Sequence, residues 1–407
     1  MKKLLFYFAI FIILIFLYIS TLTITALIPS SMIKDNIKKS VGRIFYIDRF
    51  TDAVMLDIAY RIDSTKPLES VIKANVSSIE EGIDSFDGYS PLSALANEFS
   101  TIHDEKYDYS FDYARFWHGY LIFLRPILII LDYYPIIILE SILLIILLII
   151  FEIELYKKTN KYIALAFLLS LISIGYIFIG LNIAMFFTMV IAMIFSIILL
   201  KRANSIKDIY LFFIIDGSVT CFFNYMTFTP ITLGIPLIVY YLIQDNYSIK
   251  HFVKIIFAYL ISYALTWVSK WIISDLLFGT NIINDSINQM VFRTSLFVPE
   301  HDFQINPLVS VSINMIQMGI PLMMESIYLL IMLAKSHCST KSFFKGLKTK
   351  KNLIFILIGL IPFAVYLITV NHSVIHAGSY SFRLLALTEI SAFIVMYNIL
   401  EKNKKDS

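Results

Sequence analysis

Residues 4–27 read LLFYFAIFIILIFLYISTLTITAL, a run without a single charged side chain. An α-helix of about 20 apolar residues crosses the hydrocarbon core of a bilayer. Lys2 and Lys3 stand directly before the run. The apolar region of a secretory signal peptide is shorter, so we interpret this run as an uncleaved first transmembrane helix.

Similar apolar runs fill most of the remaining chain. Of the 407 residues, 58% are hydrophobic and 15% are charged, whereas a soluble domain is about half apolar and a quarter charged. We therefore predict an all-α polytopic membrane protein of about ten transmembrane helices, with a mixed segment of helices and loops after the first. The further spans are expected at 135–153, 161–181, 183–200, 209–225, 229–243, 252–273, 307–334, 353–370 and 382–400.

The basic residues predict how these spans are oriented. Short loops on the cytoplasmic side of a membrane carry an excess of lysine and arginine. With the N-terminus inside, the short inner segments include those with Lys157 and Lys158, with Lys201 and Arg202, and the lysine-rich stretch 335–351. The short outer loops hold only Arg293 and Arg383. This predicts that both termini are cytoplasmic, and the Ile, Lys and Asn bias suggests a bacterial cytoplasmic membrane.

The predicted organisation has four parts: a first transmembrane helix (1–28), an outer segment (29–134), a bundle of about nine helices (135–400) and a cytoplasmic tail (401–407). Within the outer segment, apolar residues at helical spacing predict a helix over 51–62. Its last part, YARFWHGY at 113–120, runs into the apolar stretch 121–131. Aromatic residues and arginine at such a border are typical of a helix lying at the membrane interface.

Two kinds of chemistry are disfavoured by the sequence. The chain has only Cys221 and Cys338, which the topology places near opposite faces, so a disulfide framework is not expected. No Cys/His cluster has zinc-binding spacing. Binding of nucleic acid is not expected either, because the lysines lie in short inner loops that the orientation already explains.

Acidic residues of the outer segment are the candidate catalytic groups. Asp48, Asp52 and Asp57 lie in the stretch YIDRFTDAVMLD at 46–57. They could form a solvated helix face, with Asp48 or Thr51 as an N-cap. Alternatively, Asp48 and Asp52, four residues apart, share one face of a helix and act as a general base on a substrate hydroxyl or hold a divalent cation together.

Basic residues near the outer surface are the candidate phosphate ligands. Arg115, His118 and Arg125 flank the predicted interfacial helix, and Lys270 lies between Trp267 and Trp271. Anchoring in the lipid headgroups, or snorkelling of Lys270, would explain them without further function. A guanidinium group, however, also binds phosphate oxygens through two parallel hydrogen bonds.

The last outer turn adds His372, His376 and Arg383. The two histidines stand four residues apart and would face the same way on a helix. Zinc binding would need a third ligand, which is not evident, so phosphate binding by His376 and Arg383 is favoured over a metal site. A plain polar loop is the alternative.

Polar residues at membrane depth are expected to be few: Asp216, with Asn182 and Ser170 as further candidates. Asp216 could simply form a hydrogen bond with a hydroxyl of a neighbouring helix, while Pro230, Gly234 and Pro236 would distort the following span. A transporter would place its coupling residues near the midplane. The sequence therefore favours chemistry at the outer face.

This layout resembles the GT-C glycosyltransferases, polytopic enzymes that use polyprenyl-phosphate sugars. The resemblance lies in a first helix, a large outer segment with acidic residues, and a bundle whose outer loops carry basic residues. It implies that Asp48 or Asp52 serves as the base. It also implies that Arg125, Lys270, His376 or Arg383 holds the donor phosphate. The family's acidic residue follows the first helix more closely, often as an adjacent acidic pair, whereas Asp48 comes about twenty residues later without an acidic neighbour.

We therefore expect an inverting transfer of a sugar from a polyprenyl-phosphate donor to a glycan or protein acceptor at the outer face, among membrane lipids. Asp48 and Asp52 are the expected catalytic residues. No cofactor is assigned, and a divalent cation held by the acidic residues is left open. A surface-polysaccharide polymerase or ligase, a transporter and a non-catalytic membrane scaffold are the alternatives. The expected phosphate ligands are Arg115, His118, Arg125, Lys270, His372, His376 and Arg383.

Overall fold

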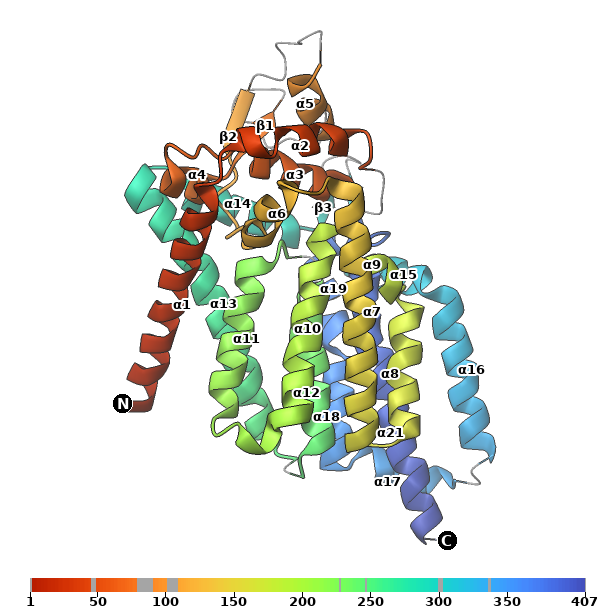
Figure 1. Ribbon diagram of the computed structural model, residues 1–407. Helices are drawn as coiled ribbons and strands as arrows, with labels where there is room; N and C mark the ends of the chain where they lie inside the picture. The colour runs from red at the N-terminus through yellow and green to blue at the C-terminus, as the bar shows by residue number, and fades with distance from the viewer. Residues whose placement is uncertain are drawn as a thin grey trace.

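The structure is a computed structural model that describes residues 2–44, 49–78, 91–100, 109–226, 228–245, 247–298, 303–335 and 338–406. It consists of a bundle of long helices with a layer of short helices and strands over one end (Figure 1). We call this layer the cap and that end of the bundle the cap end. Both chain termini lie at the opposite, terminal end (Figure 1).

The bundle contains the long apolar helices and several shorter ones. Predicted spans coincide with helices or with pairs of helices, and short 3₁₀ turns lie at Ala203–Ser205 and Ser381–Leu385. The bundle helices are α1 (Lys2–Ala26), α7 (Tyr133–Lys158), α8 (Lys161–Ser173), α9 (Tyr176–Ile179), α10 (Ile183–Arg202), α11 (Ile209–Phe223), α12 (Pro230–Ile243), α13 (Ile249–Phe278), α15 (Pro307–Gln317), α16 (Gly319–Lys335), α18 (Lys350–Gly359), α19 (Ile361–Ile368) and α21 (Ala386–Asp406).

Length and composition support a multi-pass membrane protein. In the described ranges, six helices are long and apolar enough to cross a membrane. A seventh span is formed if α15 and α16, which meet at an angle of 81°, count as one. Helices α8, α11 and α12 are apolar but shorter. The all-α membrane class is thus supported, and the count of ten crossings stays a prediction.

Polar residues mark where the bundle helices begin. A side-chain oxygen at the N-cap accepts a hydrogen bond from an otherwise unpaired amide of the first turn. Asn160, Asn182 and Asp208 do so at the starts of α8, α10 and α11, and Ser248 does so at the start of α13. These caps lie between apolar runs, which is why the run boundaries in the sequence predict the helix boundaries well.

The cap is built from the segment after α1 and from the connection after α13. Two short antiparallel ribbons, β1–β2 and β3–β4, contribute to the described part of it. Its elements are a 3₁₀ turn (Ser30–Met32), α2 (Lys34–Val41), α3 (Arg49–Arg61), α4 (Pro67–Lys73), β1 (Asn75–Ser78), α5 (Pro91–Glu98), β2 (Tyr109–Asp112), α6 (Leu121–Leu128), α14 (Ile282–Thr294), β3 (Phe297–Val298), β4 (Phe303–Gln304) and α20 (Val370–Ile375). Helix α17 (Thr340–Leu347) is not part of the cap and lies at the terminal end (Figure 1).

Helix α3 confirms the helix expected over 51–62, but its acidic residues are more buried than the sequence predicts. Val54, Met55 and Ile58 are buried as their spacing predicts. Asp52 and Asp57 are buried as well, with exposed fractions of 1% and 0%. The solvated helix face considered for these two carboxylates is therefore wrong, because bundle and cap elements cover α3 on both sides.

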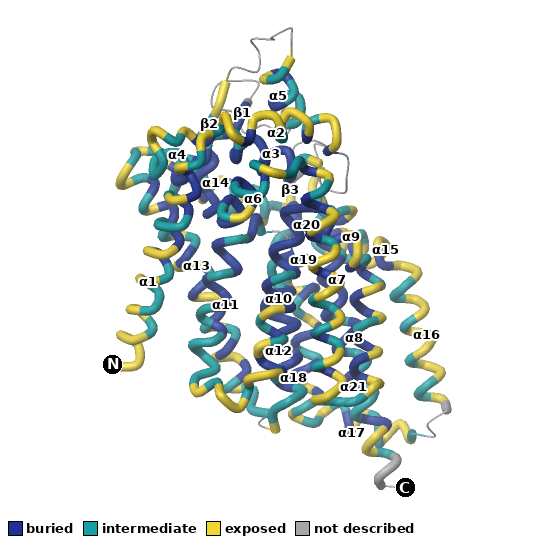
Figure 2. The backbone as a smooth tube through the Cα atoms, in the orientation of Figure 1, coloured by how far each residue is buried: buried dark blue, intermediate teal, exposed yellow. Residues whose placement is uncertain are grey.

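Helix α1 stands at one side of the bundle and exposes much of its surface (Figures 1 and 2). Tyr18 is an exception, since its hydroxyl lies 3.1 Å from the Ser218 hydroxyl of α11. Nearer the terminal end, α1, α11 and α13 enclose an apolar cavity of about 760 Å³ that Phe8, Phe11 and Leu265 help to line. Exposed apolar surface of this extent fits a helix in contact with lipid.

Candidate functional site at the cap end

Arg125 fastens the cap to the first helix. It lies on α6 and is completely buried. Its guanidinium group donates hydrogen bonds to the backbone carbonyls of Ile28, just after α1, and Ala59, on α3. Carbonyls at helix ends lack intrahelical partners, so a buried arginine between them stabilises both ends. Its predicted role as a phosphate ligand stays a prediction, and in this conformation its two terminal nitrogens are engaged.

Lys270 joins α13 to the cap in a similar way. Its ammonium group is fully buried and lies 3.0 Å and 2.7 Å from the carbonyl oxygens of Val71 and Ile72, near the end of α4. The same group lies 5.5 Å from the centre of the Trp117 ring. The snorkelling expected of Lys270 is therefore wrong, because its charged end points into the protein.

Arg115 and Arg383 are also engaged with the protein. Arg115 forms an ion pair with Asp285 of α14 at 2.8 Å. Arg383 donates to the backbone carbonyl of Ile174, between α8 and α9, and to that of Ser379 at 2.9 Å. Both side chains are at least 95% buried, so each holds two distant segments together. Their predicted phosphate binding is not tested by these contacts.

Asp52 interacts with the beginning of α10. Its carboxylate accepts hydrogen bonds from the amides of Ile183 at 3.0 Å and Ala184 at 3.4 Å. It also accepts one from the Tyr133 hydroxyl at 2.6 Å. The N-terminus of a helix carries a partial positive charge that stabilises such an anion. Asp48, its predicted partner in catalysis, lies outside the described residues.

A second acidic group, Glu140, lies close to Asp52 on α7. The side chain is 8% exposed, its Oε2 atom has no hydrogen-bond partner, and its carboxyl group interacts electrostatically with Asp52. Glu140 lines an apolar cavity of about 340 Å³ together with Leu124, Ile136 and Phe223. Burying an acidic residue inside an apolar span costs free energy, and such residues are usually kept for a function. Glu140 is therefore a functional candidate.

His118 is held in a strained and fully engaged position. Its φ angle is +59°, which is unfavourable for a residue with a side chain. Nδ1 lies 2.6 Å from the Tyr225 hydroxyl, and Nε2 lies 2.8 Å from the carbonyl oxygen of Tyr113. Because the carbonyl can only accept, Nε2 carries the proton. Burial, with the positive charges of Lys270 and Arg115, lowers the pKa of His118 to about 3.

Gly119 allows this histidine to lie against α11. A Cβ atom at Gly119 would lie 2.6 Å from the carbonyl oxygen of Phe222, and the Gly119 amide donates to that same oxygen at 2.9 Å. The motif WHGY at 117–120 is therefore a site of close backbone packing. This contact places His118 beside the loop that connects α11 to α12.

The α11–α12 loop shows further backbone strain. Met226 has a φ of +63° and Phe228 a φ of +27°. Strained backbone concentrates at functional sites, where surrounding contacts hold it in place. The Met226 backbone interacts electrostatically with the His372 ring. This loop thus connects two of the predicted site histidines, His118 through Tyr225 and His372 through Met226.

His372 and His376 lie together on one side of α20, as their spacing predicts. Their ring centres are 4.6 Å apart, and the His376 ring stacks on Tyr380 at 4.4 Å. Nδ1 of His372 lies 2.7 Å from Nη1 of Arg293. Burial, with the charge of Arg293, lowers the pKa of His376 to about 3. Burial, His376 and Arg293 together hold the pKa of His372 well below its usual value.

Arg293 is a site residue that sequence reasoning missed. The sequence shows it only as an outer-loop charge, because the two histidines that it meets come about 80 residues later in the chain. Within the described ranges, its guanidinium has one bonding partner, the His372 ring, and no carboxylate partner. Four of its five N–H groups are therefore available to a ligand.

Sequence reasoning also underestimated the acidic residues in the spans. Besides Glu140, Glu325 on α16 interacts with Glu389 on α21, and Ser173 of α8 donates a hydrogen bond to Glu389. Asp216 accepts a hydrogen bond from Thr220 of its own helix at 3.3 Å, and its Oδ2 atom has no hydrogen-bond partner among the described residues, so the bond to a neighbouring helix that was considered for it is not found. In the sequence these residues appear as single charges within apolar runs.

A search for metal-binding clusters and comparisons with known proteins both give no positive result. Among the described residues, no group of three or more His, Cys, Asp or Glu side chains is arranged to hold a metal ion, so zinc at His372 and His376 has no third ligand there. Comparison with protein-family models, curated proteins and solved structures finds no match for this chain. The function is accordingly argued from the geometry.

Proposed function

We propose that this protein is a membrane glycosyltransferase that moves a sugar from a polyprenyl-phosphate donor to an acceptor. The reaction would take place at the cap end, which is predicted to face outward. Three things support the proposal: the resemblance of the layout to GT-C enzymes, an apolar cavity beside an acidic group, and a partly unpaired arginine beside two histidines.

The arginine carries the proposal. Arg293 presents N–H groups that no described residue occupies, and planar guanidinium matches the geometry of phosphate oxygens. His372 and His376 stand beside it as neutral rings, able to donate or accept. In the proposal these three side chains hold the donor phosphate and stabilise the negative charge of the leaving group. Positive charge fixed in advance at a developing anion is an effective catalytic device.

Asp52, Glu140 and Asp48 are the proposed acidic residues of the reaction. A general base must reach the acceptor hydroxyl as its oxygen attacks the sugar carbon. Asp52 already accepts three hydrogen bonds, whereas the Oε2 atom of Glu140 has no hydrogen-bond partner. We therefore add Glu140 to the predicted pair as a group with an oxygen free to exchange a proton, with Asp52 holding α10 in position.

The lipid chain of the donor would lie in the cavity of about 340 Å³ beside Glu140. Phe123 and Leu139 extend its apolar wall, and both are exposed on the bundle surface. A cavity whose wall continues into exposed apolar surface can admit a lipid from the side.

Consumption of a radiolabelled polyprenyl-phosphate hexose tests this function. The purified protein is placed in vesicles with a membrane extract as the source of acceptor. We expect time-dependent loss of the donor and appearance of polyprenyl phosphate. Failure with every hexose donor tried, in protein that remains folded, would contradict the transferase.

A transporter is the second candidate, because Glu325 and Glu389 meet within apolar spans. The neighbouring break between α15 and α16, with its 81° bend, resembles the discontinuous helices that bind substrates in transporters. Substrate uptake into sealed vesicles that is abolished by Glu389→Gln would favour this function. The transferase would show donor turnover in open and sealed vesicles alike.

A further inference from the structure

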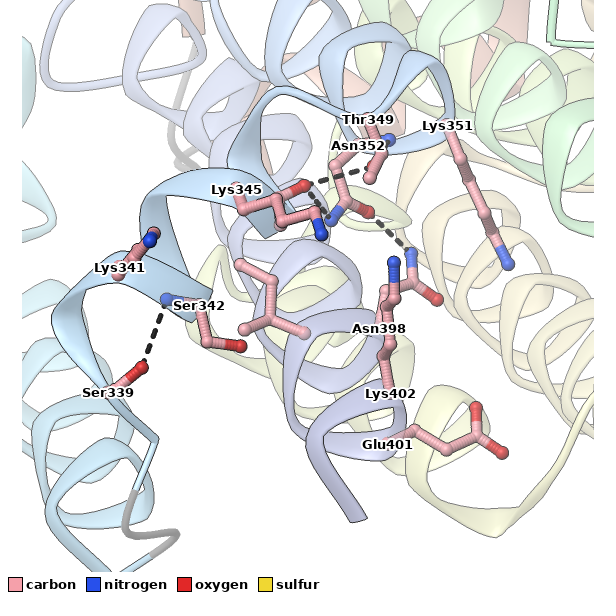
Figure 3. A pocket seen from close by; sticks show the side chains of 12 residues that line it. Ser339, Lys341, Ser342, Lys345, Thr349, Lys351, Asn352, Asn398, Glu401 and Lys402 are labelled. Atoms are coloured by element: carbon pink, nitrogen blue, oxygen red, sulfur yellow. Dashed lines mark hydrogen bonds between the residues drawn. The ribbon is translucent and has the colours of Figure 1, made fainter. Parts of the chain in front are cut away.

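A cavity of about 580 Å³ is lined by residues of α17, α18 and α21 (Figure 3). Figure 1 places α17 at the terminal end, away from the cap. Helix α17, the beginning of α18 and the last turns of α21 form its walls. Figure 3 shows lysine side chains from all three helices around it. The proposed transferase chemistry does not use this cavity.

Close packing fixes the floor of the cavity. A Cβ atom at Gly346 would lie 2.7 Å from the Ile399 side chain, so glycine allows α17 to approach α21. Asn352 donates to the Gly346 carbonyl at 3.0 Å, and Asn398 donates to the Asn352 side-chain oxygen at 2.8 Å (Figure 3). The three helices are thus held together around a defined space.

The cavity is strongly basic. Lys341, Lys345, Lys351 and Lys402 line it, opposed by the single carboxylate of Glu401. Lys341 and Lys345 are four residues apart and share one face of α17. Among the described residues, none of the four lysines forms an ion pair. Lys351 interacts electrostatically with Glu401 and Asp245 and lies over the Tyr247 ring, so the basic charge of the cavity is only partly compensated. The gathered like charges repel one another, and an anion bound between them would relieve that repulsion.

Hydroxyl and amide groups complete the lining. Ser342, Thr349 and Asn398 face the cavity with the lysines. Ser339 and Thr349 cap the beginnings of α17 and α18. Two helix N-termini therefore add partial positive charge near the same cavity, and such termini favour phosphate groups.

The position at the membrane surface indicates the source of the anion. Helix α17 exposes Phe344 on one side and carries Lys341 and Lys345 toward the cavity. An amphipathic helix of this kind lies in the interface, with aromatic residues toward the acyl chains and lysines at headgroup level. Basic pockets between membrane helices bind the phosphates of anionic lipids.

The orientation of the protein in the membrane does not by itself explain why four lysines line this cavity. Lysines on this side of the membrane satisfy the positive-inside rule wherever they stand. Lys348 and Lys350 satisfy it while lying outside the cavity lining, on the same stretch of chain. We propose that the cavity of Lys341, Lys345, Lys351 and Lys402 binds the phosphate of an anionic lipid headgroup.

The test is native mass spectrometry of the full chain in detergent. The probes are dihexanoyl phosphatidic acid, dihexanoyl phosphatidylcholine and inorganic phosphate. We compare the wild type with Lys341→Ala/Lys345→Ala, and with Lys348→Ala/Lys350→Ala, which removes the same charge from the same segment. Size-exclusion profiles establish that each variant is folded.

We expect phosphatidic acid to bind the wild type, and phosphatidylcholine to bind much more weakly. The Lys341/Lys345 variant should lose roughly tenfold or more in affinity, and the Lys348/Lys350 variant should not. Inorganic phosphate binding as tightly as phosphatidic acid would assign the site to a free phosphate instead of a lipid. Equal losses in both lysine variants, or no phosphate-dependent binding, would overturn the proposal.

Discussion

Nη1 of Arg293 and Nδ1 of His372 lie 2.7 Å apart, although 79 residues separate them in the chain. The contact joins the end of α14 to α20 at the cap end. Because the lowered pKa of His372 keeps its ring neutral, Nδ1 accepts a hydrogen bond from Nη1 of Arg293. The histidine thereby orients the guanidinium without neutralising its charge. A cation that is oriented but not paired is suited to bind an anionic ligand.

Replacing Glu140 with Gln tests the proposed proton exchange. The substitution keeps the shape of the side chain and removes its ability to take a proton. We expect transfer from a polyprenyl-phosphate sugar to fall by about a hundredfold or more, the range typical for a lost general base. Initial rates of donor consumption provide the measurement. Wild-type rates in this variant would remove Glu140 from the mechanism.

Replacing Arg125 with Leu should affect stability more than donor binding. The change leaves the carbonyls of Ile28 and Ala59 buried without a donor. Unsatisfied buried polar groups cost about 1–3 kcal/mol each, so we expect a marked fall in unfolding temperature in detergent. Arg43→Leu, which removes an arginine half exposed to solvent, is the control. A variant of unchanged stability that fails to bind donor would restore Arg125 as a phosphate ligand.

The lowered pKa of His118 predicts how the free energy of unfolding depends on pH. Its pKa is about 3 in the folded protein, against an ordinary value of 6.5. The unfolded chain therefore binds the proton more readily, and the stabilisation present above pH 6.5 is lost as the pH falls below that value. Between about pH 7.5 and about pH 5 this group should cost about 2 kcal/mol of unfolding free energy.

His118→Phe tests this dependence. The variant lacks the titrating ring, so its stability should fall less steeply over the same pH range, whatever its absolute value. Thermal unfolding in detergent across a pH series gives the comparison. A slope as steep as that of the wild type would mean that folding does not lower the pKa of His118.

Much of the fold could be predicted from the sequence, because single runs of residues decide where helices lie. Apolar stretches such as 135–153 became α7, and Asn160 and Asn182 ended the preceding loops by capping the next helix. The close contact at Gly119 could not be predicted. It depends on Phe222, more than a hundred residues away in the chain.

The candidate site was predicted less completely, for the same reason. The type of a charged residue does not reveal whether a distant backbone carbonyl already binds it, as with Lys270 and Val71. His372 and His376 came together because four residues make about one helical turn. Glu140 had a local signal, a lone charge within an apolar run, but its neighbour Asp52 comes from α3.

The most direct test of the account is native mass spectrometry of the purified protein, with and without added polyprenyl phosphate. We expect the wild type to retain or bind the lipid, and Arg293→Gln to bind it roughly tenfold more weakly or worse, since guanidinium–phosphate bonds are charge-assisted. Arg43→Gln, at an exposed arginine of the cap, should bind like the wild type. A wild-type protein that binds no polyprenyl phosphate, or an Arg293 variant that binds it equally well, would contradict the proposed phosphate site.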